Sequence, residues 1–243
     1  MCTVNAIVLA GGRGIRMDPI TQTTQKCLLP IDGKPAILHI MEALVNEFGS
    51  VDLIVGVAYR AEEVATFIDR NKPRAISATY VPHILGTEGW GIYRDLRPYI
   101  HGSFVAMPGD IVALPHAYSN VLKAFEKSET DAAITMSPDV DTVDTHGVGY
   151  IVGNRAVDLT WPPPLTLSPN CLRDMTIWAG DERIFDLIEK YPNPGKSIGH
   201  VFMDAIRDRR PIAGNYYDEP WVHLGYPADL QKTLGCQVSY LVA

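Results

Sequence analysis

The segment of the sequence best suited to chemistry is a glycine-rich loop accompanied by cations. It contains three glycines and three cations, Gly11, Gly12, Gly14, Arg13, Arg16 and Lys26. Because glycine has no Cβ, the backbone N–H groups of such a loop can turn inward and phosphate oxygens can approach closely. Arginine adds charge-assisted hydrogen bonds to those oxygens. The pattern therefore predicts a phosphate-binding loop, whereas the glycines alone would fit an ordinary tight turn.

Two familiar phosphate motifs are excluded. A Walker loop needs Gly-x-x-x-x-Gly-Lys-Ser/Thr, which the sequence lacks. The dinucleotide fingerprint needs a further glycine where this chain has Met17. The loop is therefore expected to bind phosphate without either of these motifs.

Asp110 is the candidate metal ligand. It follows the apolar run 104–107 through a Pro-Gly pair, which places it at the carboxyl end of a predicted strand. Ligands of open α/β sheets usually bind at that edge. Mg²⁺ prefers carboxylate and phosphate oxygens, so a cation bridging Asp110 to a phosphate is chemically reasonable. The alternative is an aspartate in a surface turn.

Strands and helices alternate through the first 137 residues. The expected strands are 4–9, 51–57, 75–81, 103–107 and 132–136, and the expected helices are 35–48, 61–70, 86–96 and 116–127. This alternation predicts an α/β fold with a doubly wound, mostly parallel, Rossmann-like sheet. The rest is less regular, with strands at 148–152 and 212–217 and helices at 182–190, 198–207 and 227–234.

Composition limits the class of protein. The chain has 243 residues, 47% hydrophobic and 20% charged, and a net charge of −7. Such an acidic chain lacks the broad basic surface of nucleic-acid-binding proteins. No apolar stretch is long enough for a signal peptide or membrane span, and the four scattered cysteines suggest free thiols. We expect a cytoplasmic protein without nucleic-acid or membrane partners; its oligomeric state, a homo-oligomer included, stays open.

Residues 9–35 resemble the signature of the sugar-1-phosphate nucleotidyltransferases, the NDP-sugar pyrophosphorylases. That signature is Leu-Ala-Gly-Gly-x-Gly-x-Arg-Leu-x-Pro-x-Thr, then Pro-Lys, then Lys-Pro, and the chain matches it in order and spacing. Met17 replaces a Leu, and Gln25 replaces the Pro before Lys26. Both replacements look mild.

The resemblance implies a nucleotidyltransferase fold and a set of contacts with a nucleoside triphosphate. Gly14 and Arg16 would hold the β- and γ-phosphates, and Lys26 would lie at the α-phosphate. The segment 85–89 is similar to the family's Leu-Gly-Thr-x-Gly, a loop that meets the base, although its Thr is also a good helix N-cap. Residues expected to line the base and ribose are Leu9, Ala10, Gly11, Gly12, Gly86 and Thr87.

A second metal position departs from the family pattern. Residues 221–230 resemble Trp-x-Asp-Ile-Gly-Thr-Pro-x-Asp-Leu, but His223 stands at the family's metal-binding Asp. Imidazole is a poor ligand for Mg²⁺ and a better one for softer ions such as Mn²⁺ or Co²⁺. Either His223 binds such an ion, or Asp110 holds Mg²⁺ alone, or turnover is impaired. We favour Mg²⁺ on Asp110 with weak or no help from His223.

The acceptor half matches less well. The family's Glu-Lys-Pro supplies a Lys to the sugar phosphate, and Trp161 takes its place here. Asn-x-Gly-Ile-Tyr, which lines the family's sugar site, has no clean counterpart, although 175–178 is a candidate for that strand. The acceptor phosphate then falls to other cations, each of which could equally be a surface residue. Those cations are Arg173, Arg183 and Lys196.

The predicted reaction is attack by an acceptor phosphate oxygen on the α-phosphorus of a nucleoside triphosphate, releasing pyrophosphate. A sugar 1-phosphate acceptor would make this a step of nucleotide-sugar biosynthesis, with guanylyl or uridylyl transfer favoured. The alternatives are another phosphorylated acceptor, such as phosphocholine, a phosphonate or a modified sugar, and an inactive regulatory homologue. We expect one nucleotidyltransferase domain over 1–243, with a nucleotide-binding part to about 137 and a smaller, irregular acceptor-binding part over 138–243.

Overall fold

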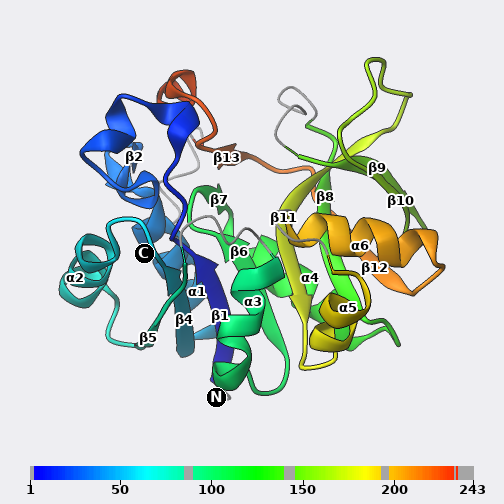
Figure 1. Ribbon diagram of the computed structural model, residues 1–243, viewed down its shortest axis with the longest axis horizontal. Coiled ribbons are helices and arrows are strands. Elements are labelled where there is room, and N and C mark those ends of the chain that lie inside the picture. The colour runs from blue at the N-terminus through cyan, green and yellow to red at the C-terminus, as the bar shows by residue number, and fades with distance from the viewer. Residues whose placement is uncertain (1–2, 85–89, 140–145, 193–196, 233, 235–243) are drawn as a thin grey trace. The chain divides into compact units, whose positions relative to one another are not determined.

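The computed structural model describes residues 3–84, 90–139, 146–192, 197–232 and 234 (Figure 1). They fall into two compact units. Unit 1 comprises the described residues of 1–85, 107–116 and 219–243, and unit 2 those of 86–106 and 117–218. The chain therefore enters each unit more than once. The predicted division near residue 137 is between a nucleotide-binding part and an acceptor-binding part, not between these compact units, and it stays a prediction.

A parallel sheet forms the centre of unit 1. Its strands β1 (Val4–Leu9), β4 (Val51–Val57) and β5 (Ile76–Pro82) lie in the order β5-β4-β1 (Figure 1). Both pairings are parallel, and the last residue of β1 stands opposite Gly56 of β4. Apolar residues fill β4 almost completely, as expected for a strand covered on both faces. The carboxyl end of β1 opens into the glycine-rich loop.

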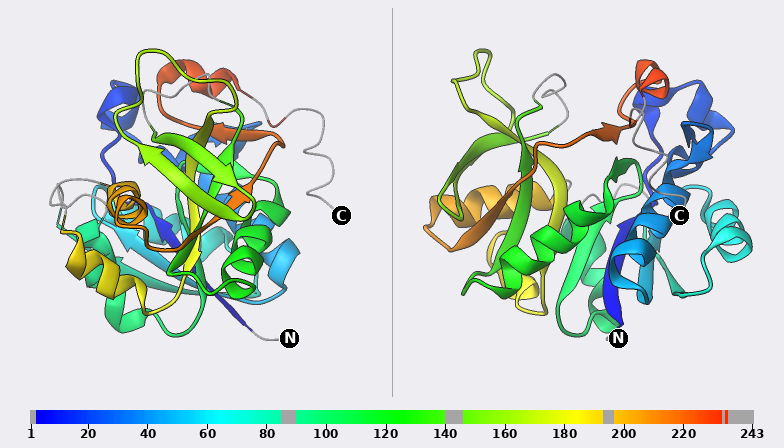
Figure 2. Two further views of the ribbon diagram at one scale, coloured as in Figure 1. Left: turned by 90° about the vertical axis from the view of Figure 1, so that its right-hand side faces the viewer. Right: turned by 180° about the vertical axis from the view of Figure 1, so that it is seen from behind.

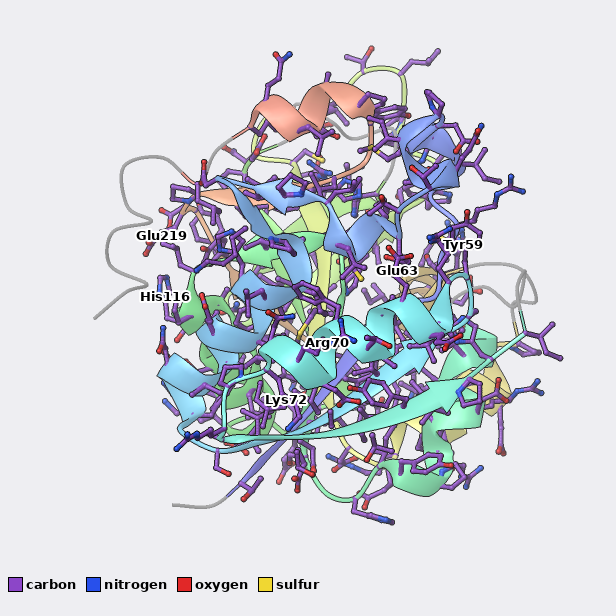
Figure 3. The ribbon with its side chains drawn as sticks, turned by 90° about the vertical axis from the view of Figure 1, so that its left-hand side faces the viewer. Tyr59, Glu63, Arg70, Lys72, His116 and Glu219 are labelled. Atoms are coloured by element: carbon purple, nitrogen blue, oxygen red, sulfur yellow. The ribbon has the colours of Figure 1, made fainter. Side chains whose placement is uncertain are left out.

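Two helices connect these strands. Helix α1 (Ala36–Phe48) contacts β4 and ends at Gly49, whose φ of 79° is readily available only to glycine. Helix α2 (Ala61–Asn71) contacts β5 and buries Val64 and Ile68, while Arg70 lies exposed on its outer side (Figure 3). The two crossovers confirm the expected alternation of strands and helices.

Short elements complete unit 1. They are the 3-10 turns η1 (Ile15–Met17), η2 (Ile20–Gln22) and η3 (Lys26–Leu28), the pair β2 (Pro30–Ile31) and β3 (Lys34–Pro35), and the antiparallel pair β7 (Ile111–Ala113) and β13 (Trp221–His223). His116 Nε2 and Glu219 Oε1, 3.0 Å apart, join the segments that carry β7 and β13 (Figure 3). Residues 227–231, expected to begin a helix, form the 3-10 turn η6 (Pro227–Gln231).

Unit 2 contains a mixed sheet. Its strands are β6 (Phe104–Pro108, of which 104–106 belong to this unit), β8 (Ala132–Ser137), β9 (Val148–Val152), β10 (Arg155–Thr160), β11 (Leu172–Gly180) and β12 (Ile212–Tyr216). They lie in the order β6-β11-β8-β12-β10-β9, and β9 also pairs with β11 (Figure 2). Only β8 and β12 run parallel among these pairings. This part of the chain is thus more regular than expected.

Aromatic side chains form part of the core of unit 2. Trp178 contacts the rings of Phe104 and Phe202, and its Nε1 donates to Tyr93 Oη at 3.1 Å. The indole is 1% exposed, so it is a core residue. The helical elements of the unit are α3 (Trp90–Leu96), η4 (Arg97–Tyr99), α4 (Pro115–Glu126, from 117), α5 (Ile184–Lys190) and α6 (Ile198–Arg207). None of the helices within the described ranges has the length and apolar character needed to span a bilayer.

Candidate nucleotide and metal site

The glycine-rich loop begins where β1 ends, in unit 1. Backbone hydrogen bonds fix its start, because Ala10 N donates to Gly56 O at 2.8 Å and Gly109 N donates to Leu9 O at 2.8 Å. Gly14 has a φ of 68°, in the left-handed region that favours glycine. A Cβ on Gly11 would lie 2.2 Å from Cε1 of His83. The backbone conformation at 14 and the close packing at 11 therefore explain two of the three glycines.

The carbonyl oxygens of this loop are bound by the protein itself. Gln25 Nε2 donates to Ala10 O at 2.6 Å and to Gly12 O at 3.1 Å. The backbone N–H of Tyr59, which lies just before α2 (Figure 3), donates to Gly11 O at 3.1 Å. The hydroxyl of Thr21 donates to the carbonyl of residue 14 at 2.9 Å. Four of the five carbonyls between 10 and 14 thus have a protein donor.

The N–H groups of the same peptides consequently point away from these donors. In a trans peptide the C=O of one residue and the N–H of the next point in opposite directions, and the peptides of this loop are trans. Within the described ranges, no N–H between Gly11 and Ile15 donates to a protein acceptor. Successive unsatisfied N–H groups form an anion-binding concavity. The loop has such a run of unsatisfied N–H groups, which makes it a candidate for that role.

Two arginines add positive charge to the loop. Arg13 and Arg16 are both exposed, and neither is paired with a carboxylate among the residues that the structure describes. The Arg16 guanidinium lies 5.4 Å from the ring centroid of Tyr226, which supports the side chain by a cation–π contact. Without acidic partners, these cations suit an anionic ligand.

Lys26 and Asp110 form a close ion pair beside the loop, with side chains 14% and 13% exposed. Lys26 is the first residue of η3, and Asp110 follows the end of β6. Gly109 permits this approach, because a Cβ there would lie 3.1 Å from Cys27 Cβ and 3.2 Å from Leu9 O. The structure therefore brings together two residues predicted separately from the sequence.

His223 lies next to this pair. Its Nε2 is 3.7 Å from Asp110 Oδ2, and the side chain is 8% exposed. At that distance the contact is electrostatic rather than a hydrogen bond. Burial alone would raise the pKa of Asp110, but the Lys26 ammonium and the nearby His223 outweigh burial and hold it well below its usual range. Asp110 is therefore ionised at neutral pH.

The donor set fits a divalent cation that is shared with phosphate. Lys26 and His223 both approach Asp110 at Oδ2. The same residues include no group of three or more His, Cys, Asp or Glu side chains that could enclose a metal. The chain would therefore supply one carboxylate oxygen and at most one imidazole. Phosphate and water would supply the rest, as is usual for Mg²⁺.

Most of the predicted site residues lie in unit 1, and their contacts with a ligand stay predictions. Gly86 and Thr87 lie outside the described residues. The unit 1 set is Leu9, Ala10, Gly11, Gly12, Gly14, Arg16, Lys26, Asp110 and His223.

Sequence reasoning missed the residues that hold the loop. Gln25 seemed a mild replacement, yet it is 2% exposed and bonded at both ends. The sequence indicated this role only by a polar residue at the position where the family signature has Pro. Thr21 and Tyr59 gave no signal of their own beyond the place of the Thr in that signature, because their contacts depend on the folded loop.

Unit 2 holds a second candidate group, on β11. The backbone of Thr176 has a φ of 55°, which is strained for a β-branched residue. Thr176 N donates to Oδ1 of Asp174 at 2.8 Å, and burial raises the pKa of that carboxyl to about 6. Strained backbone and shifted pKa values are common at functional sites. The spacing from Asp174 to Trp178 equals that of Asn-x-Gly-Ile-Tyr, with Thr176 at the glycine.

The cations considered for the acceptor phosphate have different surroundings. Arg173 is 2% exposed and its Nη2 lies 2.9 Å from His146 Nδ1, so it is not a solvated surface residue. Arg183 is exposed and bonds Asp181. Lys196 lies outside the described residues. A pocket of about 620 Å³ in this unit is lined by residues including Ile151 and Tyr216, and none of its described lining residues is a cation.

Comparisons with known proteins identify the family to which the chain belongs. A family model described as the MobA-like NTP transferase domain matches residues 6–195. The bifunctional protein GlmU of Methanococcus maripaludis is 25% identical over 93% of this chain and 53% of its own length. The UTP–glucose-1-phosphate uridylyltransferase AglF of Haloferax volcanii is 29% identical, with 93% of both chains covered.

The fold is confirmed by a solved structure. The inositol-1-phosphate CTP transferase from T. maritima superimposes with a TM-score of 0.79 at 19% identity, covering 99% of this chain and 95% of that one. At this identity the likeness concerns the fold alone. The chain spans about half the length of the GlmU proteins it matches. Since the family model covers most of the chain, this protein belongs to the MobA-like NTP transferase domain family.

Proposed function

We propose that the protein transfers the nucleotidyl group of a nucleoside triphosphate to a sugar 1-phosphate, giving an NDP-sugar and pyrophosphate. The observation that carries this proposal is the loop after β1. Its carbonyls are bound by the protein, its N–H groups from Gly11 to Ile15 have no acceptor within the described ranges, and Arg13 and Arg16 stand beside it. These donors and charges match a polyphosphate.

The ion pair beside the loop suggests where the reacting phosphate lies. Lys26 would bind the α-phosphate, and Asp110 would hold Mg²⁺ through a carboxylate oxygen. A bound cation would neutralise charge that develops on the phosphate oxygens. Lys26 would then exchange the Asp110 carboxylate for a phosphate, and Asp110 would exchange the Lys26 ammonium for the metal ion. The exchange keeps both side chains neutralised, so binding need not leave a buried charge unpaired.

The chain's own residues would act by positioning and by charge stabilisation. Arg16 would bind the departing pyrophosphate, and the loop N–H groups would orient the triphosphate tail. A general base is unnecessary, because the attacking oxygen of a phosphate is already ionised near neutral pH. These are the demands that phosphoryl-transfer chemistry generally makes on a protein.

The name of the Haloferax volcanii relative supports UTP and glucose 1-phosphate as the first pair to test. A different phosphorylated acceptor is the second candidate, because Trp161 replaces the Lys of the resembling motif and β11 carries the buried acid Asp174. An inactive nucleotide-binding homologue is the third, motivated by His223. The proposal includes Mg²⁺ as the ion and the cytoplasm as the location.

Pyrophosphate release tests the proposal directly. The four common ribonucleoside triphosphates and dTTP are each paired with a panel of sugar 1-phosphates and with phosphocholine, in Mg²⁺ and in Mn²⁺. We expect release with at least one sugar 1-phosphate, and its loss in Lys26→Ala. Release only with phosphocholine would support the second candidate. Triphosphate binding without release in any combination would support the third.

A further inference from the structure

Gln25 is a buried polar side chain that joins two parts of the nucleotide site. Its Nε2 donates to Ala10 O at 2.6 Å and to Gly12 O at 3.1 Å, and its Oε1 accepts from Cys27 N at 2.6 Å. The side chain is 2% exposed. Both ends of the amide are therefore satisfied within unit 1, as a buried amide requires.

The two ends of this amide have different consequences. The donor end holds the carbonyls of Ala10 and Gly12, and thereby turns the N–H groups of Gly11 and residue 13 the opposite way. The acceptor end bonds the second residue of η3, the turn that begins with Lys26. One side chain thus connects the peptides of the loop with the segment that carries the lysine.

We propose that Gln25 is a positioning residue that presents the loop N–H groups to the triphosphate and fixes η3 relative to them. The inference rests on the proposed function. Gln25 stands where the resembling signature has Pro, and its φ of −68° is one that proline also adopts. The backbone at this position is therefore compatible with either residue. The contacts to Ala10, Gly12 and Cys27 depend on the glutamine side chain alone.

Two substitutions separate the functions of the side chain. Gln25→Glu keeps its size and an oxygen for Cys27 N, but the carboxylate has no donor for Ala10 O or Gly12 O. Gln25→Pro keeps the backbone conformation and removes all three contacts without introducing a buried charge. Gln22→Glu, at an exposed glutamine on η2, adds the same charge to the same segment and serves as the matched control.

Binding is measured first, with inorganic tripolyphosphate and Mg²⁺ by isothermal titration calorimetry, which needs no knowledge of the base. We expect Gln25→Glu and Gln25→Pro to bind at least about tenfold more weakly than wild type, since each loses the hydrogen bonds to Ala10 O and Gly12 O. Gln22→Glu should stay within about threefold, because its added charge is exposed and screened. Thermal unfolding of each variant shows that the assay temperature lies well below its midpoint.

Steady-state kinetics of pyrophosphate release then distinguish positioning from mere stability. Gln25→Glu should raise KM for the triphosphate and leave kcat within about threefold, because the Cys27 contact still holds η3. Gln25→Pro should raise KM and also lower kcat by about tenfold or more, because that contact is lost as well. A purely structural residue would lower the unfolding temperature without this split.

The outcomes separate this inference from the proposed function. Wild-type affinity for tripolyphosphate in both folded Gln25 variants, or in Gln25→Pro alone if Gln25→Glu does not fold, would overturn the role of Gln25 and leave the function standing. Weakened binding in the variants, with no pyrophosphate released by wild type, would overturn the function alone. Failure of wild type to bind tripolyphosphate or any nucleoside triphosphate would overturn both.

Discussion

Removing Lys26 should damage stability and activity for two separable reasons. Lys26→Met keeps an unbranched side chain but leaves Asp110, which is 13% exposed in its side chain, with only His223 nearby. Breaking a buried pair costs about 3–5 kcal/mol, and the residual exposure reduces this to about 2–4 kcal/mol. For a chain of this length that loss lowers the unfolding midpoint by about 5–15 °C. Pyrophosphate release should fall about 100-fold or more.

The double variant tells the two effects apart. Lys26→Met with Asp110→Asn removes both charges, so no uncompensated charge remains and stability should return most of the way to wild type. Activity should stay lost, because the phosphate cation and the metal ligand are both gone. Thermal or urea unfolding of the wild type, the two single variants and the double variant gives the coupling energy between Lys26 and Asp110. We expect it to exceed about 1 kcal/mol. The same cycle at Arg97 and Glu189, an exposed pair in unit 2, should give less than about 1 kcal/mol.

Two results would refute this reasoning. A double variant as unstable as the summed single variants would show that Lys26 and Asp110 do not stabilise each other. Normal turnover in Lys26→Met would show that the lysine has no contact with the reacting phosphate. The Arg97–Glu189 pair serves as the control for the coupling energy. A general effect of lost charge would give the same coupling energy in its cycle as in the cycle of Lys26 and Asp110.

Three further predictions concern other parts of the chain. Gly14→Ala should lower stability by about 1 kcal/mol in urea unfolding and weaken triphosphate binding, since φ is 68° and the new Cβ would lie 3.1 Å from Thr21 Cγ2. Asp174→Asn should stabilise the protein by up to about 3 kcal/mol at pH 8 and by little at pH 4. Burial raises the pKa of the Asp174 carboxyl to about 6, so the wild-type folded state loses stability as pH rises through that value. His223→Asp should tighten Mg²⁺ binding in calorimetry without nucleotide, and unchanged affinity would show that this position does not face the ion.

The sequence predicted the part of the fold that depends on local pattern. The strands at 4–9 and 51–57 and the helices at 36–48 and 61–71 lie within one or two residues of their predicted bounds. Their apolar patterns indicate them, and Gly49 marks the end of the first helix. Strand β10 was missed because half of its residues are polar, with Asp158 exposed. Besides its neighbour β9, this strand packs against α6, which is distant in sequence and which no local pattern indicates.

The candidate site was predicted residue by residue but not as an arrangement. Lys26 and Asp110 were named for separate reasons, and their ion pair required the close approach of Gly109 to Leu9 and Cys27. In the sequence Gln25 is evident only as a replacement of proline, whereas its hydrogen bonds become evident in the folded loop. A buried glutamine next to a glycine-rich loop is informative, because its amide must find partners and loop carbonyls are the nearest ones.

The charge count at the ion pair explains why His223 matters even if it never contacts a metal. An Asp at position 223, as in the motif that residues 221–230 resemble, would place a second carboxylate near Lys26 and leave a net charge of −1 to attract a cation. Here Asp110 is the one carboxylate that faces Lys26 among the described residues, and His223 brings no negative charge, so the pair is balanced. A balanced pair attracts a free divalent ion weakly, whereas triphosphate brings the charge that is missing. The metal should therefore enter together with the nucleotide, and His223→Asp should restore binding of the metal alone.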